Sequence, residues 1–256
     1  MLAKAMYRMA EPMTAIDVRN VSKSFPSYDD TRFDALSGVS VSIEEGSLCI
    51  VGGENGSGKS LLMNIIAGLE KPSSGTVEVS SKVGLVFQDA DSQILGETPM
   101  EDVCFGLSNV GIRGDAAKKA ATEALRRVRL HEKANSPSHF LSGGEKRRLA
   151  IAAVLALGFK TLILDEPYSN LDYAGVKDVN ALVEELHSTG ATIVVLTHEI
   201  EKCLALADRF VVLKAGHVVF DGTPSGGLTQ GPDVWNGWGI RNPLCAYPTL
   251  ESLVWR

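Results

Sequence analysis

A glycine-rich run limits the possible folds of this chain more than any other part of it: Gly53-Glu54-Asn55-Gly56-Ser57-Gly58-Lys59-Ser60. The run fits the pattern G-x-x-x-x-G-K-[ST] without a mismatch. The apolar segment 48–51 before it predicts a buried strand, and the segment after it predicts a helix. The expected apolar face of that helix consists of Leu61, Leu62, Ile65, Ile66 and Leu69. A strand, a glycine loop and a helix in this order are typical of a phosphate-binding loop, because glycines let several backbone N–H groups point at one anion.

The loop predicts that the chain binds a nucleoside triphosphate. Lys59 would reach the β- and γ-phosphates, and the Ser60 hydroxyl would hold Mg²⁺. The alternative is a glycine–serine turn that matches by coincidence, which the flanking strand and helix argue against. The expected nucleotide contacts are Gly53, Glu54, Asn55, Gly56, Ser57, Gly58, Lys59, Ser60 and Leu61.

Length, charge and cysteine content narrow the classes of protein. The 256 residues allow one large α/β domain or a domain with a subdomain. The net charge of −6 argues against a surface that neutralises nucleic-acid phosphates, so no nucleic-acid partner is expected. No apolar stretch approaches the roughly 18 residues of a membrane helix, so any work at a membrane would go through partners. The cysteines form no C-x-x-C pair and predict reduced thiols: Cys49, Cys104, Cys203 and Cys245.

The first half of the chain predicts two kinds of structure. Alternating apolar residues over 15–48 indicate antiparallel strands with a polar turn at 26–34, and short strands are expected at 76–79 and 83–87. Residues 89–158 are helical in character and predict a subdomain inserted into a parallel α/β core. The residues that recur there at helical spacing are Ala117, Ala120, Ala121, Ala124, Leu125 and Val128.

The second half returns to α/β character. Strands are expected at 161–164 and 192–197, with a helix over 175–188 between them. A hairpin is expected from 209–213 and 217–221, turning at Ala215-Gly216. The inward face of the helix would consist of Val176, Val179, Leu182, Val183 and Leu186.

Both ends of the chain differ from the rest. Residues 1–13 predict a flexible extension, and Met6, Met9 and Met13 leave the start of translation open. The tail 224–256 is rich in Gly and Pro and holds all three tryptophans, Trp235, Trp238 and Trp255. We favour anchoring of the tail against the core over docking of a partner, because tryptophan buries a large apolar area.

A pair of carboxylates follows the predicted strand at 161–164. A strand that ends in Asp165-Glu166 presents a magnesium ligand and a base at the edge of a phosphate-binding site. Asp165 would hold Mg²⁺, mainly through water, and Glu166 would be the general base that deprotonates the attacking water. An ordinary acidic turn would be the better interpretation of this pair alone, but not downstream of a phosphate-binding loop.

The segment Leu141-Ser142-Gly143-Gly144-Glu145 opens a predicted helix. Ser142 and Glu145 fit the capping box S-x-x-E, so one interpretation is simply a well-capped helix. The two glycines also leave backbone N–H groups uncovered, which makes an anion site at the helix N-terminus. The segment resembles the signature motif of ATP-binding cassette (ABC) ATPases.

The resemblance to this family extends from about residue 14 to 223 and implies roles for further residues. Gln88 resembles the glutamine that touches Mg²⁺ and reports to the membrane subunit. Asp172, in Ser169-Asn170-Leu171-Asp172, resembles the D-loop aspartate near the nucleotide, and His198 resembles the histidine that contacts the γ-phosphate. Phe25 stands where the family has an aromatic residue stacked on adenine, and the nearby Tyr28 is the alternative.

The same resemblance implies the architecture. It is a P-loop NTPase core with an N-terminal antiparallel β subdomain and an inserted α-helical subdomain. In this family two cassettes enclose two ATP molecules, and the phosphate-binding loop of one faces the residues equivalent to Ser142, Gly143 and Gly144 of the other. The expected partners are therefore a second ATPase chain, identical or a sister subunit, and a membrane protein that the ATPase drives from the cytoplasmic face.

The segment 83–94 is similar to the ATPases of energy-coupling factor (ECF) transporters, where a second glutamine, here Gln93, follows the first by five residues. Segments 101–106 and 146–152 continue the likeness. Asp89-Ala90 stands where these ATPases usually have Asn-Pro, and Glu145 where they commonly have Gln. ECF transporters import vitamins or transition-metal ions through a transmembrane scaffold and a small substrate-binding membrane protein.

In this interpretation Gln88, Asp91 and Gln93 line the groove for the scaffold, although a solvated loop is an open alternative for Asp91 and Gln93. A subunit of a conventional ABC transporter is the nearest rival, since it would use the same catalytic residues. Soluble cassettes of translation control carry two cassettes in one chain. Chromosome-organising cassettes need long arms, whereas 81 residues separate Lys59 from Leu141. A non-hydrolysing cassette is excluded because Glu166 and His198 are present.

Overall fold

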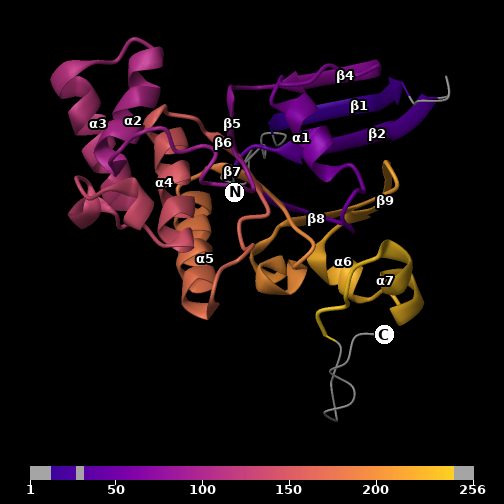
Figure 1. Ribbon diagram of the computed structural model, residues 1–256. Helices are drawn as coiled ribbons and strands as arrows, with labels where there is room; N and C mark the ends of the chain where they lie inside the picture. The colour runs from indigo at the N-terminus through magenta and orange to yellow at the C-terminus, as the bar shows by residue number, and fades with distance from the viewer. Residues whose placement is uncertain (1–12, 27–31, 245–256) are drawn as a thin grey trace, which may run out of the picture.

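The computed structural model describes residues 13–26 and 32–244, so Tyr28, Cys245 and Trp255 lie outside the described residues. Two sheets form the body of the molecule (Figure 1). The first has three antiparallel strands in the order β2-β1-β4, as the alternating pattern predicted. Its strands are β1 (Thr14–Pro26), β2 (Arg32–Glu44) and β4 (Ser74–Val79).

The second sheet has six strands in the order β5-β6-β7-β3-β8-β9. All neighbours in it are parallel except β8 and β9, which form the predicted antiparallel hairpin. Ala215 and Gly216 turn this hairpin with positive φ values of 46° and 76°, as a tight two-residue turn requires. The strands are β3 (Leu48–Gly52), β5 (Val83–Val86), β6 (Thr161–Asp165), β7 (Thr192–Leu196), β8 (Arg209–Lys214) and β9 (His217–Gly222).

The helices occupy separate regions of Figure 1. Helix α1 (Lys59–Ile66) packs under the antiparallel sheet, whereas α2 (Pro99–Asn109), α3 (Gly114–Arg127) and α4 (Gly143–Ala156) gather at the left of the view. These three helices are inserted between β5 and β6, two strands that are neighbours in the sheet. Helix α5 (Tyr173–Ser188) adjoins α4. After strand β9 the described part of the chain has two short helices, α6 (Pro224–Leu228) and α7 (Pro232–Trp238). The proposed domain limits, 14–223 with a helical subdomain at 89–158, stay predictions.

Strand β3 separates two hydrophobic cores. Leu48 and Ile50 point to the core that the helices α2 to α5 help to build, and Cys49 and Val51 point to the core shared with α1 and the antiparallel sheet. A strand buried on both faces reads as a continuous apolar run, which is what segment 48–51 shows. The prediction that Leu69 belongs to the apolar face of α1 is wrong. The helix ends at Ile66, Gly68 takes a left-handed φ of 75°, and Leu69 is 62% exposed.

Two tail tryptophans are buried. Trp235 and Trp238 lie 4.9 Å apart between ring centroids and pack against Phe210 of β8 at 6.0 and 6.2 Å. A Cβ on Gly52, at the end of β3, would lie 3.0 Å from the Phe210 ring and 3.4 Å from Ile240. The tail segment therefore packs directly behind the start of the phosphate-binding loop.

Three cysteines lie in the described part of the chain. All three are free thiols. Burial raises the pKa of Cys49 and of Cys203 to about 12, so both stay protonated near neutral pH. Protonated, buried thiols react slowly, which is consistent with a structural role in the core.

Candidate functional site

The polar residues of interest lie where strands of the six-stranded sheet end. The phosphate-binding loop follows β3, Gln88 follows β5, Glu166 follows β6, and His198 follows β7. These strands are parallel, so their carboxyl ends meet at one edge, which is the usual binding edge of such sheets.

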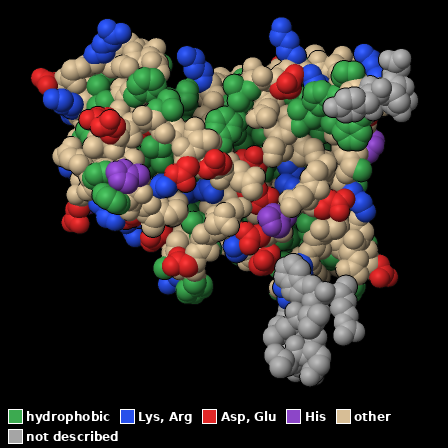
Figure 2. All heavy atoms as spheres, viewed as in Figure 1, with side chains coloured by type: hydrophobic (Ala, Val, Ile, Leu, Met, Phe, Trp, Pro, Cys, Tyr) green, Lys and Arg blue, Asp and Glu red, His purple; other side chains and the backbone are tan. Residues whose placement is uncertain are grey.

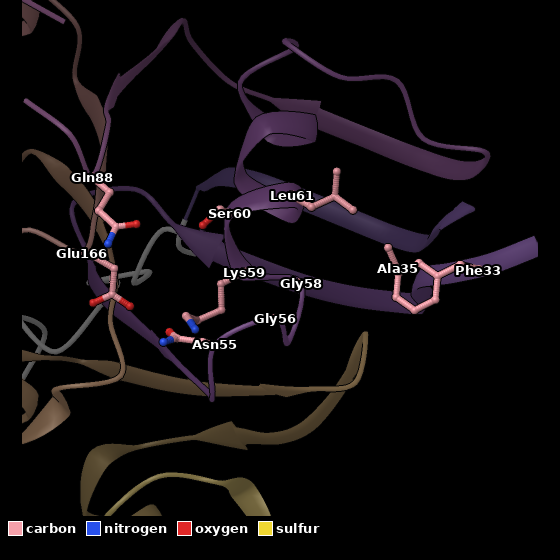
Figure 3. A pocket seen from close by; sticks show the side chains of 10 residues that line it. All are labelled: Phe33, Ala35, Asn55, Gly56, Gly58, Lys59, Ser60, Leu61, Gln88 and Glu166. Carbon is pink, nitrogen blue, oxygen red and sulfur yellow. The ribbon is translucent and has the colours of Figure 1, made fainter. Parts of the chain in front are cut away.

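A cavity of about 450 Å³ opens at this edge. Figure 3 shows Phe33 and Ala35 of β2 on one side, Gln88 and Glu166 on the other, and Lys59 between them. Its volume suits a small-molecule ligand. The residues that line it are Phe33, Ala35, Asn55, Gly56, Gly58, Lys59, Ser60, Leu61, Gln88 and Glu166.

The loop conformation depends on its glycines. Gly53 and Gly58 have φ values of 145° and 102°, and a Cβ on Gly53 would overlap the carbonyl oxygen of Leu213. Helix α1 begins after Gly58 without a side-chain cap, so its first N–H groups stay available for an anion. Of the predicted contacts, Gly53, Glu54 and Ser57 do not line the cavity, and the Ser57 side chain is buried.

Lys59 is drawn into the loop. Its Nζ donates hydrogen bonds to the carbonyl oxygens of Gly53 at 2.7 Å and Glu54 at 3.0 Å. The residue is only 6% exposed, and burial lowers the pKa of its ammonium. The Lys59 ammonium lies at the N-terminus of α1 and is shielded from solvent. Because little water competes for its hydrogen bonds, it is a strong partner for phosphate oxygens.

One carboxylate oxygen of Asp165 makes no hydrogen bond within the described residues. Its Oδ1 is buried and has no hydrogen-bond partner among the residues described, while the carboxylate interacts with the Ser60 hydroxyl. Burial raises the pKa of Asp165. Hard oxygen ligands of this kind suit Mg²⁺, so Ser60 and Asp165 fit the cation that a nucleotide would bring.

Replacing Asp165 with Asn should stabilise the ligand-free protein and weaken Mg²⁺-nucleotide binding. A raised pKa in the folded state means that protonation favours folding, so the wild-type gains stability as pH falls through that raised pKa. Asn has no charge to bury, and we expect the Tm at pH 7.5 to rise by roughly 2–4 °C in thermal unfolding without nucleotide.

A matched control is Asp208→Asn. The Asp208 carboxylate accepts a hydrogen bond from Leu48 N at 2.8 Å and lies near His187, so its loss should not raise the Tm. A lower Tm for Asp165→Asn would mean that this charge is stabilised in the ligand-free protein, contrary to the expectation.

Glu166 is held rigidly at the cavity wall. It is 5% exposed and has a positive φ of 45°, with its N–H donating to Leu196 O. Its carboxylate accepts hydrogen bonds from Thr197 Oγ1 at 3.0 Å and His198 N at 3.2 Å, and His198 Nδ1 lies 2.9 Å from Oε1. A non-glycine residue keeps this conformation only when its surroundings enforce it, which is common at functional sites. The general-base role predicted for Glu166 stays a prediction.

The segment 141–145, which resembles the ABC signature motif, lies outside the cavity. Helix α4 begins at Gly143, and the predicted capping box is present: Ser142 Oγ accepts from Glu145 N at 3.3 Å, and Glu145 Oε2 accepts from Ser142 N at 2.9 Å. Asp172 caps α5 by accepting from Gly175 N at 2.8 Å. Ser142, Gly143, Gly144 and Asp172 do not line the cavity, and their nucleotide contacts stay predictions.

The aromatic end of the cavity contains a residue that the sequence analysis missed. Phe33 lines the cavity, whereas Phe25 does not and instead has Lys23 Nζ 5.1 Å from its ring centre. The two phenylalanines are paired across β1 and β2, so their side chains share a face of the sheet. Phe33 stood inside the segment interpreted as a turn, and its pairing with Phe25 is visible only in the structure.

Side chains of the loop after β5 form hydrogen bonds and an ion pair with other parts of the chain. Gln93 Oε1 accepts from Phe87 N at 3.1 Å, and Gln93 Nε2 donates to Leu85 O at 3.2 Å. Asp91 forms an ion pair of 2.5 Å with Lys146 of α4. Both ends of the Gln93 amide therefore serve the chain itself, and its predicted contact with a partner remains a prediction.

Comparison with known proteins agrees with this geometry. A family model described as ABC transporter matches residues 36–169. The energy-coupling factor transporter ATP-binding protein EcfA2 of Streptococcus sanguinis is 39% identical over 82% of this chain and 82% of its own length. The protein of the same name from Methanospirillum hungatei is 36% identical over 84% of this chain, which spans only 56% of that relative's length.

Solved structures point the same way. The structure of cbiO1 from Clostridium perfringens, part of the ABC transporter complex cbiONQ, has a TM-score of 0.77 and 32% identity, over 91% of this chain and 97% of that one. A dimeric ATP-binding cassette in a post-hydrolysis state, bound to ADP and Pi, has a TM-score of 0.74 and 30% identity, over 82% of this chain and 98% of that one.

Proposed function

This chain belongs to the ABC transporter family of ATPases, and from that premise we propose that it is the ATP-hydrolysing subunit of an energy-coupling factor importer. The observation that carries the proposal is the single cavity that brings Lys59, Gln88 and Glu166 together at the edge of the sheet. The similarity to EcfA2 and cbiO1 over more than four fifths of the chain supports the ECF type. The cargo would be a vitamin or a transition-metal ion.

In the proposed reaction the glycine loop and the Lys59 ammonium bind the phosphates of ATP. The adenine lies toward Phe33 and Phe25. Glu166 takes a proton from the attacking water, and His198 holds the Glu166 carboxylate in place. Ser60, Asp165 and Gln88 would hold Mg²⁺, which neutralises phosphate charge when it is bound.

A second ATPase chain would complete the site. Ser142 and Gly143 are exposed at the N-terminus of α4, outside the cavity of their own chain, so the anion they suit would be one bound by a partner. Phe140, two residues before Ser142, and Tyr173, directly after Asp172, are 76% and 80% exposed. Such apolar side chains favour a face that another chain covers. The partner would be a second copy or a sister subunit, as in the dimeric relative bound to ADP and Pi.

A membrane scaffold would bind at residues 88–93. None of the described helices is long and apolar enough to cross a membrane. Phe87 and Leu95, on either side of this loop, are exposed apolar residues that a scaffold helix could cover. Acidic and basic side chains are interspersed over the face shown in Figure 2, and such a mixed face does not favour a nucleic-acid partner. The subunit would then sit at the cytoplasmic face of the membrane and touch the substrate-binding membrane protein only indirectly.

Affinity purification of the tagged chain from detergent-solubilised membranes of its host tests this proposal. Mass spectrometry should identify a transmembrane scaffold and a separate small membrane protein, whose identity narrows the cargo. Recovery of two large permease subunits would instead indicate a conventional ABC transporter. Recovery of soluble proteins alone would contradict both transport functions.

A further inference from the structure

The peptide group of Phe87 is held from two sides. Its N–H donates to Gln93 Oε1 at 3.1 Å, and its carbonyl oxygen accepts from Arg147 Nη1 of α4 at 2.7 Å. Gln93 is itself fixed by its donation to Leu85 O. The next residue is Gln88, whose side chain points toward Glu166 in the cavity (Figure 3). The position of Gln88 therefore depends on bonds that neither Gln88 nor its ligand makes.

Arg147 is an unusual residue to find in this place. It is 5% exposed, burial lowers the pKa of its guanidinium, and it forms no ion pair with any residue that the structure describes. Its Nε has no hydrogen-bond partner there. Asp165, Asp89 and Glu166 favour its charge only from a distance. Burying a charge without a carboxylate partner is unfavourable. The hydrogen bond to the Phe87 carbonyl oxygen partly offsets that cost, and it is the specific polar contact of the Arg147 guanidinium.

The neighbouring residue strengthens the connection. Lys146 pairs with Asp91 in the same loop, so two consecutive residues of α4 bind the segment that carries Gln88. Arg148, the next residue, faces away and donates to Asp178 of α5 at 2.7 Å. The helix thus offers one arginine that holds the loop and one that does not.

We propose that Arg147, together with Gln93, is a positioning residue that clamps the Phe87 peptide and thereby places Gln88 at the reaction site. This inference rests on the proposed ATPase function. Gln88 would be needed for the chemical step more than for holding the nucleotide, because the glycine loop and Lys59 bind the phosphates. Loss of the clamp should therefore lower kcat far more than it weakens ATP binding.

The test compares Arg147→Met, Arg147→Lys, Gln93→Ala and the matched control Arg148→Met in the full-length chain. We expect Arg147→Met to lower kcat by about 10–100-fold, the effect of a misplacement of about 1 Å, with the ATP Kd within about 3-fold of wild-type. Arg147→Lys keeps the charge and a donor and should recover most of kcat. Arg148→Met should leave kcat within about 3-fold. The double variant Gln93→Ala/Arg147→Met should lose less than the product of the two single losses, because both act on one peptide.

A second readout does not require turnover. Hydrogen exchange of the Phe87 and Gln88 amides, measured without nucleotide, should become faster in Gln93→Ala and Arg147→Met but not in Arg148→Met. Apolar replacement of a buried charge is often tolerated, and if Arg147→Met does not fold, Gln93→Ala and Arg147→Lys still decide the question.

The inference is overturned if Arg147→Met keeps wild-type kcat, if its kcat and its ATP affinity fall by similar factors, if Arg148→Met loses as much kcat as Arg147→Met, or if amide exchange is unchanged. A wild-type chain without ATPase activity, alone or with its membrane partners, would instead contradict the proposed function. The hydrogen-exchange result would then still decide whether the clamp exists.

Discussion

Glu166→Gln should reduce ATP turnover by about 10²–10⁴-fold while leaving ATP binding nearly intact. The amide has the same shape: its oxygen can still accept from His198 N, and its nitrogen can donate to the Thr197 hydroxyl, which now donates to Glu166. The wall of the cavity should therefore keep its structure. The amide cannot accept a proton from water at neutral pH, which is the step that we propose for the Glu166 carboxylate. Single-turnover phosphate release and a nucleotide-binding titration on the same variant separate the two effects.

The same variant should accumulate as an ATP-bound dimer, because hydrolysis is the event that opens the proposed dimer. Light scattering with and without Mg²⁺-ATP measures this. Glu199→Gln is a suitable control, since Glu199 follows the neighbouring strand β7 but pairs with Lys202 and does not line the cavity. Undiminished turnover in Glu166→Gln would remove this residue from the role of base.

Local chemistry explains which parts of the site could be predicted. The conformation of the phosphate-binding loop follows from neighbouring residues, since the glycines that take positive φ and the helix that follows them are contiguous. The capping box of α4 is equally local and is confirmed. The end of α1 was placed too late because Gly68 stops the helix, while Leu69 continues the apolar spacing beyond that stop.

The contacts that sequence reasoning missed join distant parts of the chain. Arg147 and Phe87 are 60 residues apart, and no periodicity connects them. Gln93 was predicted at a partner surface because a resemblance placed it there, yet its amide bonds to Leu85 and Phe87 appear only once β5 and its loop have a shape. Phe33 is paired with Phe25 across β1 and β2, whereas the sequence analysis placed it in a turn and so gave it no strand partner.

Lys59→Ala should have the opposite signature to Glu166→Gln, with a large loss of nucleotide affinity. Charge-assisted hydrogen bonds contribute about 1.5–3 kcal/mol each, so losing those to the β- and γ-phosphates should weaken ATP binding by at least about 100-fold. The loss need not extend to folding. Without nucleotide, the hydrogen bonds of Lys59 within the described part of the chain go to the Gly53 and Glu54 carbonyl oxygens, and burial already opposes its charge.

We therefore expect a ligand-free Tm close to wild-type for Lys59→Ala, and a stabilisation by saturating ATP that is much smaller than in wild-type. Thermal unfolding over an ATP titration measures both quantities in one experiment. Lys202→Ala, which removes an ammonium that pairs with Glu199 outside the cavity, should keep the full stabilisation. Wild-type affinity in Lys59→Ala would mean that the backbone N–H groups of the loop alone hold the phosphates. A collapse of the ligand-free Tm would mean that the ammonium shapes the loop rather than binding its ligand. Lys59→Ala and Glu166→Gln together thus separate the side chain proposed to bind ATP from the side chain proposed to act in its hydrolysis.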